Sequence, residues 1–231
     1  MILHGWGSSP DRWQNLRDAL VECGIEKRQI FIPALPGFGQ KELPTPYDVD
    51  DYAAWLARYF DENHIKKPVL VGHSNGGRIA IRFCATEGDV AQLVLIGAAG
   101  IPNPHLSTKR VVFGALAAAG KKVLSPLKNT PLYSAAEKIL YKLARESDYF
   151  KASPVMKHTM QKLLAYDATP DLKKIACPVL CIWGKDDTAT PVWMGKKIAD
   201  EVANGTLKVV EGGHTLQGCD PSRVASLICH T

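Results

Sequence analysis

Short apolar runs and amphipathic stretches alternate along the chain. The apolar runs predict buried strands, which we place at residues 1–3, 29–34, 67–71, 92–96, 178–183 and 206–210. The amphipathic stretches predict helices, which we place at residues 11–24, 48–63 and 78–88. Alternation of this kind is typical of a parallel sheet covered by helices on both faces. The sequence therefore predicts an α/β fold with a mostly parallel, doubly wound sheet of about six strands.

Residues 101–175 interrupt this alternation. They contain several short helical patterns, for example at 134–145 and 154–165, with no strand pattern between them. An all-helical insertion that follows a strand of an α/β sheet can cover the strand ends, where ligands bind. We therefore predict a core formed by residues 1–100 and 176–231, and a helical lid, or cap, formed by residues 101–175.

Composition narrows the class of protein. The 231 residues, of which 46% are hydrophobic and 22% charged, suit one globular core. The chain has no apolar run of about 18 residues that could span a membrane, and its start has neither a basic leader nor an apolar signal core. Its six cysteines are scattered without metal-binding spacing, which favours reduced thiols. We expect a cytoplasmic protein without a membrane span, and we make no prediction of its oligomeric state.

Charge is unevenly distributed. The whole chain carries +5, whereas residues 101–175 contain 13 Lys or Arg against 5 Asp or Glu, which is +8 and leaves −3 for the remainder. A basic lid would favour anionic substrates, and a merely solvated basic surface is the alternative. The basic residues do not alternate with aromatic ones, so no nucleic-acid partner is predicted.

The stretch VGHSNGG, residues 71–77, contains the first candidate for chemistry. Gly72-His73-Ser74-Asn75-Gly76 fits G-x-S-x-G, and it lies between a predicted strand and a predicted helix. A serine on such a sharp turn projects above the sheet edge as a nucleophile, and the backbone N–H of Asn75 points into the same site from a helix N-terminus. We predict that Ser74 is a nucleophile.

A serine nucleophile needs a base, and the base needs a carboxylate. His214 follows the last predicted strand in a glycine-rich loop, and Asp186 and Asp187 follow the strand before it. The carboxyl ends of parallel strands share one edge of a sheet, so these side chains can meet Ser74 there. The chain order Ser, Asp, His is that of the α/β-hydrolases.

Five motifs, HGWG, PGFG, GHSNGG, WGKDD and GGH, occur in the order found in one family. The chain resembles the α/β-hydrolase fold proteins of the lid-bearing serine esterase and carbon–carbon hydrolase type. This resemblance implies that Asp187 is the acid and that the backbone N–H groups of Trp6 and Asn75 form an oxyanion hole. Gly5, Trp6 and Phe38 are expected to line the substrate pocket, and no metal or organic cofactor is expected. One departure is that only three residues precede His4, whereas the family normally has an N-terminal hairpin there; either the chain is truncated or this variant does without the hairpin.

The expected reaction is acyl transfer. Ser74 would attack the carbonyl of a small or medium carboxylic ester, His214 would transfer the proton, and water would release the acid from an acyl-enzyme. Two alternatives remain open. One is a carbon–carbon bond hydrolase of vinylogous diketone acids, and the other is a non-catalytic ligand-binding member of the fold.

Overall fold

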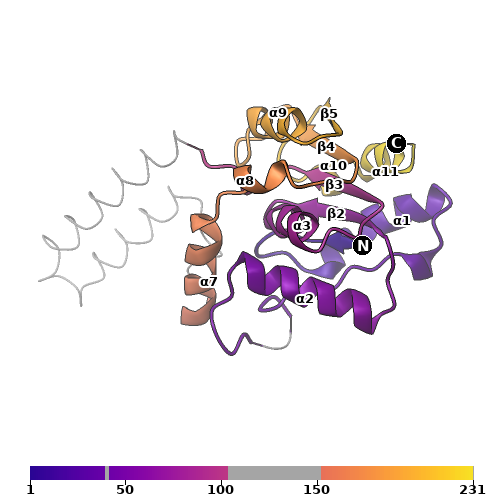
Figure 1. Ribbon diagram of the computed structural model, residues 1–231. Coiled ribbons are helices and arrows are strands. Elements are labelled where there is room, and N and C mark those ends of the chain that lie inside the picture. The colour runs from indigo at the N-terminus through magenta and orange to yellow at the C-terminus, as the bar shows by residue number, and fades with distance from the viewer. Residues whose placement is uncertain (40–41, 104–151, 231) are drawn as a thin grey trace, which may run out of the picture. The chain divides into compact units, whose positions relative to one another are not determined.

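The computed structural model describes residues 1–39, 42–103 and 152–230 (Figure 1). The chain divides into two compact units: Met1–Ile101 together with His158–Thr231, and Pro102–Lys157. The helix predicted at residues 134–145, and most of the basic residues of the predicted lid, lie outside the described residues. The assignment of residues 101–175 as a lid therefore stays a prediction.

A parallel sheet forms the centre of the first unit. Its strands in the described residues are β1 (Ile2–Leu3), β2 (Val69–His73), β3 (Gln92–Ile96), β4 (Val179–Gly184) and β5 (Gly205–Val210). Each strand pairs in parallel with the next one along the chain, in the order β1-β2-β3-β4-β5. This sheet confirms the predicted α/β fold. The carboxyl ends of all five strands therefore lie at the same edge of the sheet.

The prediction of a strand at residues 29–34 is wrong. Lys27–Gln29 forms a short 3-10 helix, η2, and the residues after it are not paired into the sheet. They lie beside β1 and make one backbone hydrogen bond to it, from the Ile2 N–H to the Phe31 carbonyl oxygen at 2.8 Å. Pro33 has no N–H to donate to a ladder, and β1 is only two residues long. The sheet described here consequently has five strands instead of about six.

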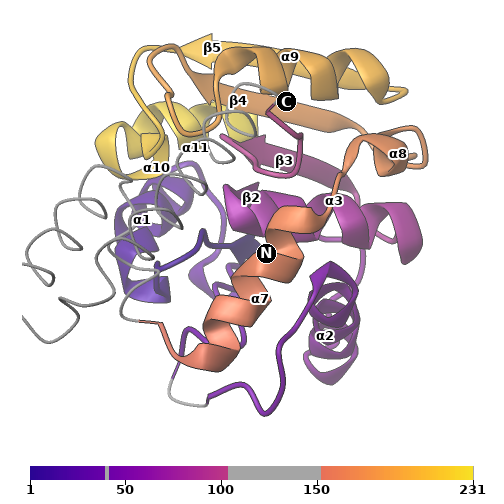
Figure 2. The same ribbon diagram turned by 90° about the vertical axis from the view of Figure 1, so that its left-hand side faces the viewer.

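Helices cover both faces of the sheet, as Figure 2 shows. One face packs against α2 (Val49–Glu62), α3 (Asn75–Thr86), α8 (Thr169–Leu172) and α9 (Val192–Glu201). The other face packs against α1 (Gln14–Glu22), α10 (Leu216–Cys219) and α11 (Pro221–Cys229). The side chains of Leu93 and Leu95 in β3 belong to the first core, and those of Val94 and Ile96 to the second. A strand that is buried on both faces reads as a continuous apolar run, which is why β3 is visible in the sequence.

Local sequence explains where the helices begin and end. Asp48 caps α2, because its Oδ1 accepts hydrogen bonds from the N–H groups of Asp50 and Asp51 while Asp51 accepts one from the Asp48 N–H. The predicted helix from Pro154 to Ala165 is present as α7. The stretch predicted at residues 11–24 begins as a 3-10 helix, η1 (Pro10–Trp13), and continues as α1.

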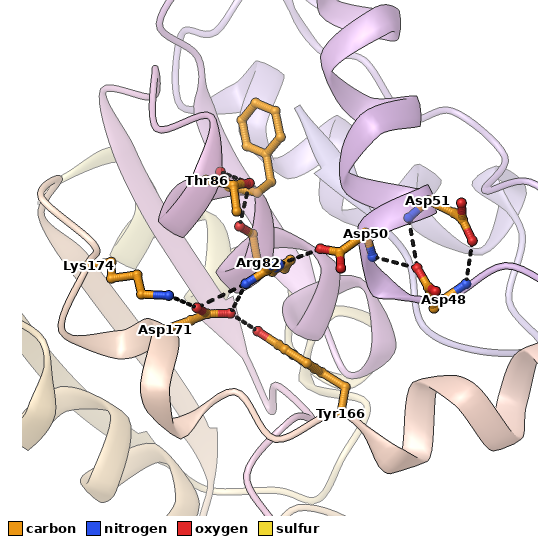
Figure 3. A network of polar contacts seen from close by, with 9 residues as sticks. Asp48, Asp50, Asp51, Arg82, Thr86, Tyr166, Asp171 and Lys174 are labelled. Carbon is orange, nitrogen blue, oxygen red and sulfur yellow. Dashed lines mark hydrogen bonds and ion pairs between the residues drawn. The ribbon is translucent and has the colours of Figure 1, made fainter.

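An ion-pair network holds α3 against its neighbours (Figure 3). Arg82 of α3 donates hydrogen bonds to Asp50 of α2 and to Asp171 of α8. The side chain of Asp171 is only 4% exposed, and it also accepts from the Tyr166 hydroxyl and the Lys174 ammonium group. Burial alone would raise the pKa of Asp171, but these donors together hold that pKa below its ordinary value. The network thus fixes the helix that begins directly after Ser74.

Candidate active site

Ser74 occupies a strained turn between β2 and α3. Its backbone angles are φ 51° and ψ −116°, a region that residues other than glycine rarely adopt and that costs about 1–3 kcal/mol. The Ser74 N–H donates to the carbonyl oxygen of Ile96, the last residue of β3, at 3.2 Å. Its own carbonyl oxygen accepts from the N–H of Ala99 at 2.9 Å. Backbone bonds to the next strand therefore tie this serine to the carboxyl edge of the sheet.

The glycines that follow Ser74 are required by close packing. A Cβ atom on Gly76 would lie 2.2 Å from the carbonyl oxygen of Leu3, and one on Gly77 would lie 2.4 Å from the Cβ of Ala98. Both separations are far shorter than any van der Waals contact, and the Leu3 atom belongs to the backbone and cannot turn aside. The pattern G-x-S-x-G-G thus lets α3 begin directly against β1 and the residues after β3.

Asp187 and His214 are hydrogen-bonded to each other. Asp187 lies in the loop after β4 and His214 in the loop after β5, and the distance from Asp187 Oδ2 to His214 Nδ1 is 2.8 Å. The two loops are also joined by a bond from the Asp186 N–H to the Gly212 carbonyl oxygen at 2.9 Å. The Asp187 side chain is 1% exposed, whereas Asp186 is exposed to solvent. Of the two aspartates that the sequence offered, Asp187 is the one beside the imidazole.

The contacts of Asp187 settle the tautomer of His214. An ionised carboxylate can only accept a hydrogen bond, so Nδ1 carries the imidazole proton and Nε2 keeps a free lone pair. Asp187 Oδ1 accepts from the N–H groups of Ala189 and Thr190, each at 2.9 Å. Burial alone would raise the pKa of Asp187, but the bonds from His214 and Thr190 outweigh it and lower that pKa. The carboxylate therefore stays charged although it is buried.

His73 connects the serine turn to the histidine loop. It directly precedes Ser74, and its Nε2–H donates to the carbonyl oxygen of His214 at 2.9 Å. The two imidazole rings lie 4.9 Å apart between centroids. His73 is the last residue of β2 and pairs with Ile96, the last residue of β3. Its hydrogen bond to the His214 carbonyl oxygen therefore holds the His214 loop at the edge of the sheet where Ser74 lies. The structure thus gathers Ser74, Asp187 and His214 at one end of the sheet.

The predicted Gly5–Trp6 loop also lies at this edge. A Cβ atom on Gly5 would be 3.2 Å from the Cβ of Ser74, so the loop passes directly over the serine. His4 anchors this loop, because its Nδ1–H donates to the Gly5 carbonyl oxygen at 2.8 Å and its Nε2 accepts from the Leu35 N–H at 3.0 Å. The rings of Trp6 and Phe38 meet edge to face at 4.8 Å. The residues predicted to line a substrate pocket are therefore neighbours.

Two residues of the site were not found from the sequence. Gly97, directly after β3, adopts φ +48°, and a Cβ atom there would lie 3.0 Å from Asp187 Oδ2 and 3.2 Å from His214 Nδ1. Thr190 places its Oγ1 2.9 Å from Asp187 Oδ2, 3.2 Å from His214 Nδ1 and 3.0 Å from the Gly97 carbonyl oxygen. The sequence offered one signal for Gly97, a run of small residues at the end of a strand. It offered none for Thr190.

Burial of His73 makes stability depend on pH. Burial first, and then the nearby His214, lower the pKa of His73 from 6.5 to about 4, while Asp187 and the bond to the His214 carbonyl act in the opposite direction and His4 adds slightly to the lowering. Between these values the unfolded chain binds a proton that the folded chain does not, so stability falls as pH decreases from about 6.5 to 4. The expected loss is about 3 kcal/mol, and it is complete below the folded pKa.

Urea unfolding of wild type and His73→Gln at several pH values tests this prediction. Glutamine cannot titrate but keeps a donor for the His214 carbonyl, so the free energy of unfolding of the variant should fall less between pH 7 and pH 4. His4 and Asp187 titrate in both proteins and cancel in the difference. Equal losses in the two proteins would contradict a buried neutral His73.

The described residues contain neither a helix long and apolar enough to cross a membrane nor a group of three or more His, Cys, Asp or Glu side chains able to hold a metal ion. The α2 helix, for example, has 14 residues, whereas a membrane-spanning helix needs about 20. The side chains of Asp187, His214 and Thr190 contact one another.

Comparison with known proteins identifies the family. A family model described as "Alpha/beta hydrolase family" matches residues 1–227. The chain belongs to the alpha/beta hydrolase family. Among its relatives, a non-heme chloroperoxidase from Streptomyces lividans is 29% identical over 231 residues, which cover 90% of this chain and 82% of the relative. A 2-hydroxymuconate semialdehyde hydrolase from Pseudomonas sp. (strain CF600) is 26% identical over 240 residues, which cover 99% of this chain and 84% of the relative.

Solved structures agree on the fold of this alpha/beta hydrolase. An esterase from Exiguobacterium antarcticum superposes with a TM-score of 0.69 at 20% identity, covering 99% of this chain and 89% of that chain. At this identity the likeness concerns the fold alone. The resemblance to the α/β-hydrolases that the five motifs indicated is thereby confirmed, and the family's relatives include esterases, chloroperoxidases and carbon–carbon hydrolases.

Proposed function

We propose that this protein is a serine hydrolase that cleaves carboxylic esters of small or medium acyl groups through an acyl-enzyme on Ser74. The observation that carries the proposal is the 2.8 Å hydrogen bond between Asp187 and His214 at the edge where Ser74 sits on a strained turn. Acyl transfer requires a nucleophile, a base and an orienting acid, and we assign these roles to Ser74, His214 and Asp187.

Each residue has a role in the proposed reaction. His214 Nε2 takes the proton of Ser74 as the hydroxyl oxygen attacks the ester carbonyl, and Asp187 holds the imidazole and stabilises the charge that it gains. The alcohol leaves with the proton that His214 returns. Water then attacks the acyl-enzyme by the same route and releases the acid and free Ser74.

Backbone N–H groups are proposed to bind the oxyanion. Asn75 is the first residue of α3, and a first-turn N–H has no acceptor within its own helix. Trp6 lies in the loop over Ser74, where the Ser8 N–H closes a turn onto the Gly5 carbonyl oxygen at 3.3 Å. Two such donors aimed at the developing charge contribute about 10²–10³-fold each to the rate.

A second candidate reaction is cleavage of a carbon–carbon bond in a vinylogous diketone acid. The relative from Pseudomonas sp. (strain CF600) carries the name of a 2-hydroxymuconate semialdehyde hydrolase and aligns over 99% of this chain. Residues 101–175 contain 13 basic and 5 acidic residues, and this positive charge would suit an anionic substrate.

Initial rates on p-nitrophenyl esters of increasing chain length test the proposed function. We expect turnover with an optimum at short or medium acyl chains, since Trp6 and Phe38 meet next to Ser74. Turnover of a vinylogous diketone acid, without turnover of any ester, would contradict ester hydrolysis and support carbon–carbon bond hydrolysis. No Ser74-dependent turnover of either class would contradict both and favour a ligand-binding role.

A further inference from the structure

Thr190 contacts both members of the Asp187–His214 pair through one oxygen atom. Its Oγ1 is within hydrogen-bond distance of Asp187 Oδ2, His214 Nδ1 and the Gly97 carbonyl oxygen. The residue is 6% exposed, so water does not compete freely for these contacts. The Thr190 hydroxyl is therefore placed to affect the hydrogen bonding of Asp187 and His214 as well as the packing around them.

The rest of Thr190 is held independently of its hydroxyl group. Its N–H donates to Asp187 Oδ1 at 2.9 Å, and its carbonyl oxygen accepts from the indole N–H of Trp183 at 2.6 Å. The turn after Asp187 is therefore built by backbone groups and by the other carboxylate oxygen. The hydroxyl group, in contrast, contacts Oδ2, the oxygen that accepts the hydrogen bond from His214 Nδ1–H.

Donor and acceptor chemistry assigns the protons. The Gly97 carbonyl and the Asp187 carboxylate can only accept, and His214 Nδ1 carries a proton, so Oγ1 accepts from His214 and donates to one of the two oxygens. The His214 N–H is thus shared between Asp187 Oδ2 and Thr190 Oγ1. A ring held by two acceptors in different directions cannot turn about a single hydrogen bond.

We propose that Thr190 is a positioning residue: its hydroxyl group fixes the plane of the His214 ring and moderates the attraction between Asp187 and His214. When the hydroxyl donates to Oδ2, it withdraws negative charge from the oxygen that faces the imidazole. When His214 becomes charged during the reaction, Oγ1 offers its N–H a second acceptor. The proposal rests on the proposed function, because it assigns Thr190 to the same reaction.

Replacement by valine separates these contacts from the fold. Thr190→Val keeps the shape and the backbone bonds of the residue and removes only the hydroxyl, whereas Thr190→Ser restores the hydroxyl. We measure the rate at which a p-nitrophenyl alkylphosphonate phosphonylates Ser74, with release of p-nitrophenol, as a function of pH. We also measure the NMR chemical shifts of the His214 ring nitrogens. The thermal unfolding of each variant shows whether it is folded.

For Thr190→Val we expect phosphonylation slower by about tenfold, which corresponds to the loss of one buried hydrogen bond. The acid limb of its pH–rate profile should be displaced, because the variant has no hydroxyl group to contact Asp187 Oδ2 and His214 Nδ1. The ring-nitrogen shifts should change in the valine variant and return towards wild type in the serine variant. A purely structural role would lower the rate without moving the profile or the shifts.

Failure of the role proposed for Thr190 can be distinguished from failure of the proposed function. A folded Thr190→Val protein with the wild-type pH profile and wild-type ring-nitrogen shifts overturns the role of Thr190, whatever its activity. Wild-type protein that the phosphonate does not modify at Ser74 overturns the proposed function, and the ring-nitrogen shifts then still decide whether the hydroxyl controls His214.

Discussion

Replacing Ser74 with alanine is expected to lower kcat for ester hydrolysis by about a million-fold while leaving the protein folded. The change removes only the attacking oxygen. The backbone at residue 74 keeps its strained conformation, because the bonds from the Ser74 N–H to Ile96 and from the Ala99 N–H to the residue 74 carbonyl do not involve the side chain. Alanine at a positive φ carries much the same strain as serine, so the free energy of unfolding should change little.

Steady-state rates and thermal unfolding of three proteins check this prediction. Ser222→Ala is the matched control, because Ser222 is an exposed serine in α11 on the opposite side of the sheet from α3. It should retain wild-type activity and stability. Substantial ester turnover by a folded Ser74→Ala protein would mean that another group performs the attack.

Replacing Asp187 with asparagine should lower kcat by about ten-thousand-fold. The N–H groups of Ala189 and Thr190 both donate to Oδ1, so the amide oxygen of asparagine will take that position. The amide NH₂ then faces His214 Nδ1, which must become an acceptor. The imidazole proton moves to Nε2, and Nε2 can no longer accept the proton of Ser74.

Asp186→Asn is the control that the chain itself provides. The two aspartates are adjacent, but the Asp186 side chain is exposed and the hydrogen bond that it makes to Gly212 comes from its backbone N–H. Asp186→Asn should therefore keep wild-type kcat. If the loss instead followed Asp186, or if the two variants lost activity equally, the assignment of the acid to Asp187 would be wrong.

Local patterns account for most of what the sequence predicted. The turn at Ser74 could be predicted because the close approach of α3 to β1 requires glycine at position 76. This requirement appears in the sequence as the five-residue pattern G-x-S-x-G. The proximity of Asp187 and His214 followed from a topological rule, since parallel strands end at one edge. Neither inference needed the details of side-chain packing.

The errors and omissions arise from contacts between distant parts of the chain. The apolar run at 29–34 satisfied the pattern of a strand, but whether it enters the sheet depends on its partner, and β1 is too short to pair with it. Thr190 and Gly97 are 93 residues apart in sequence, and only the folded sheet brings them together. One aspartate could be preferred over its neighbour by resemblance, whereas burial distinguishes them physically.

Mass spectrometry of a trapped intermediate tests the central claim most directly. Wild-type protein is mixed with p-nitrophenyl acetate, quenched with acid and digested, and the peptide that contains Ser74 is examined for an added acetyl group. The proposed mechanism predicts acetylation of Ser74 in wild type and none at this peptide in Ser74→Ala. Release of p-nitrophenol by wild type with the acetyl group on a different residue, or with the same modification in Ser74→Ala, would contradict an acyl-enzyme on Ser74.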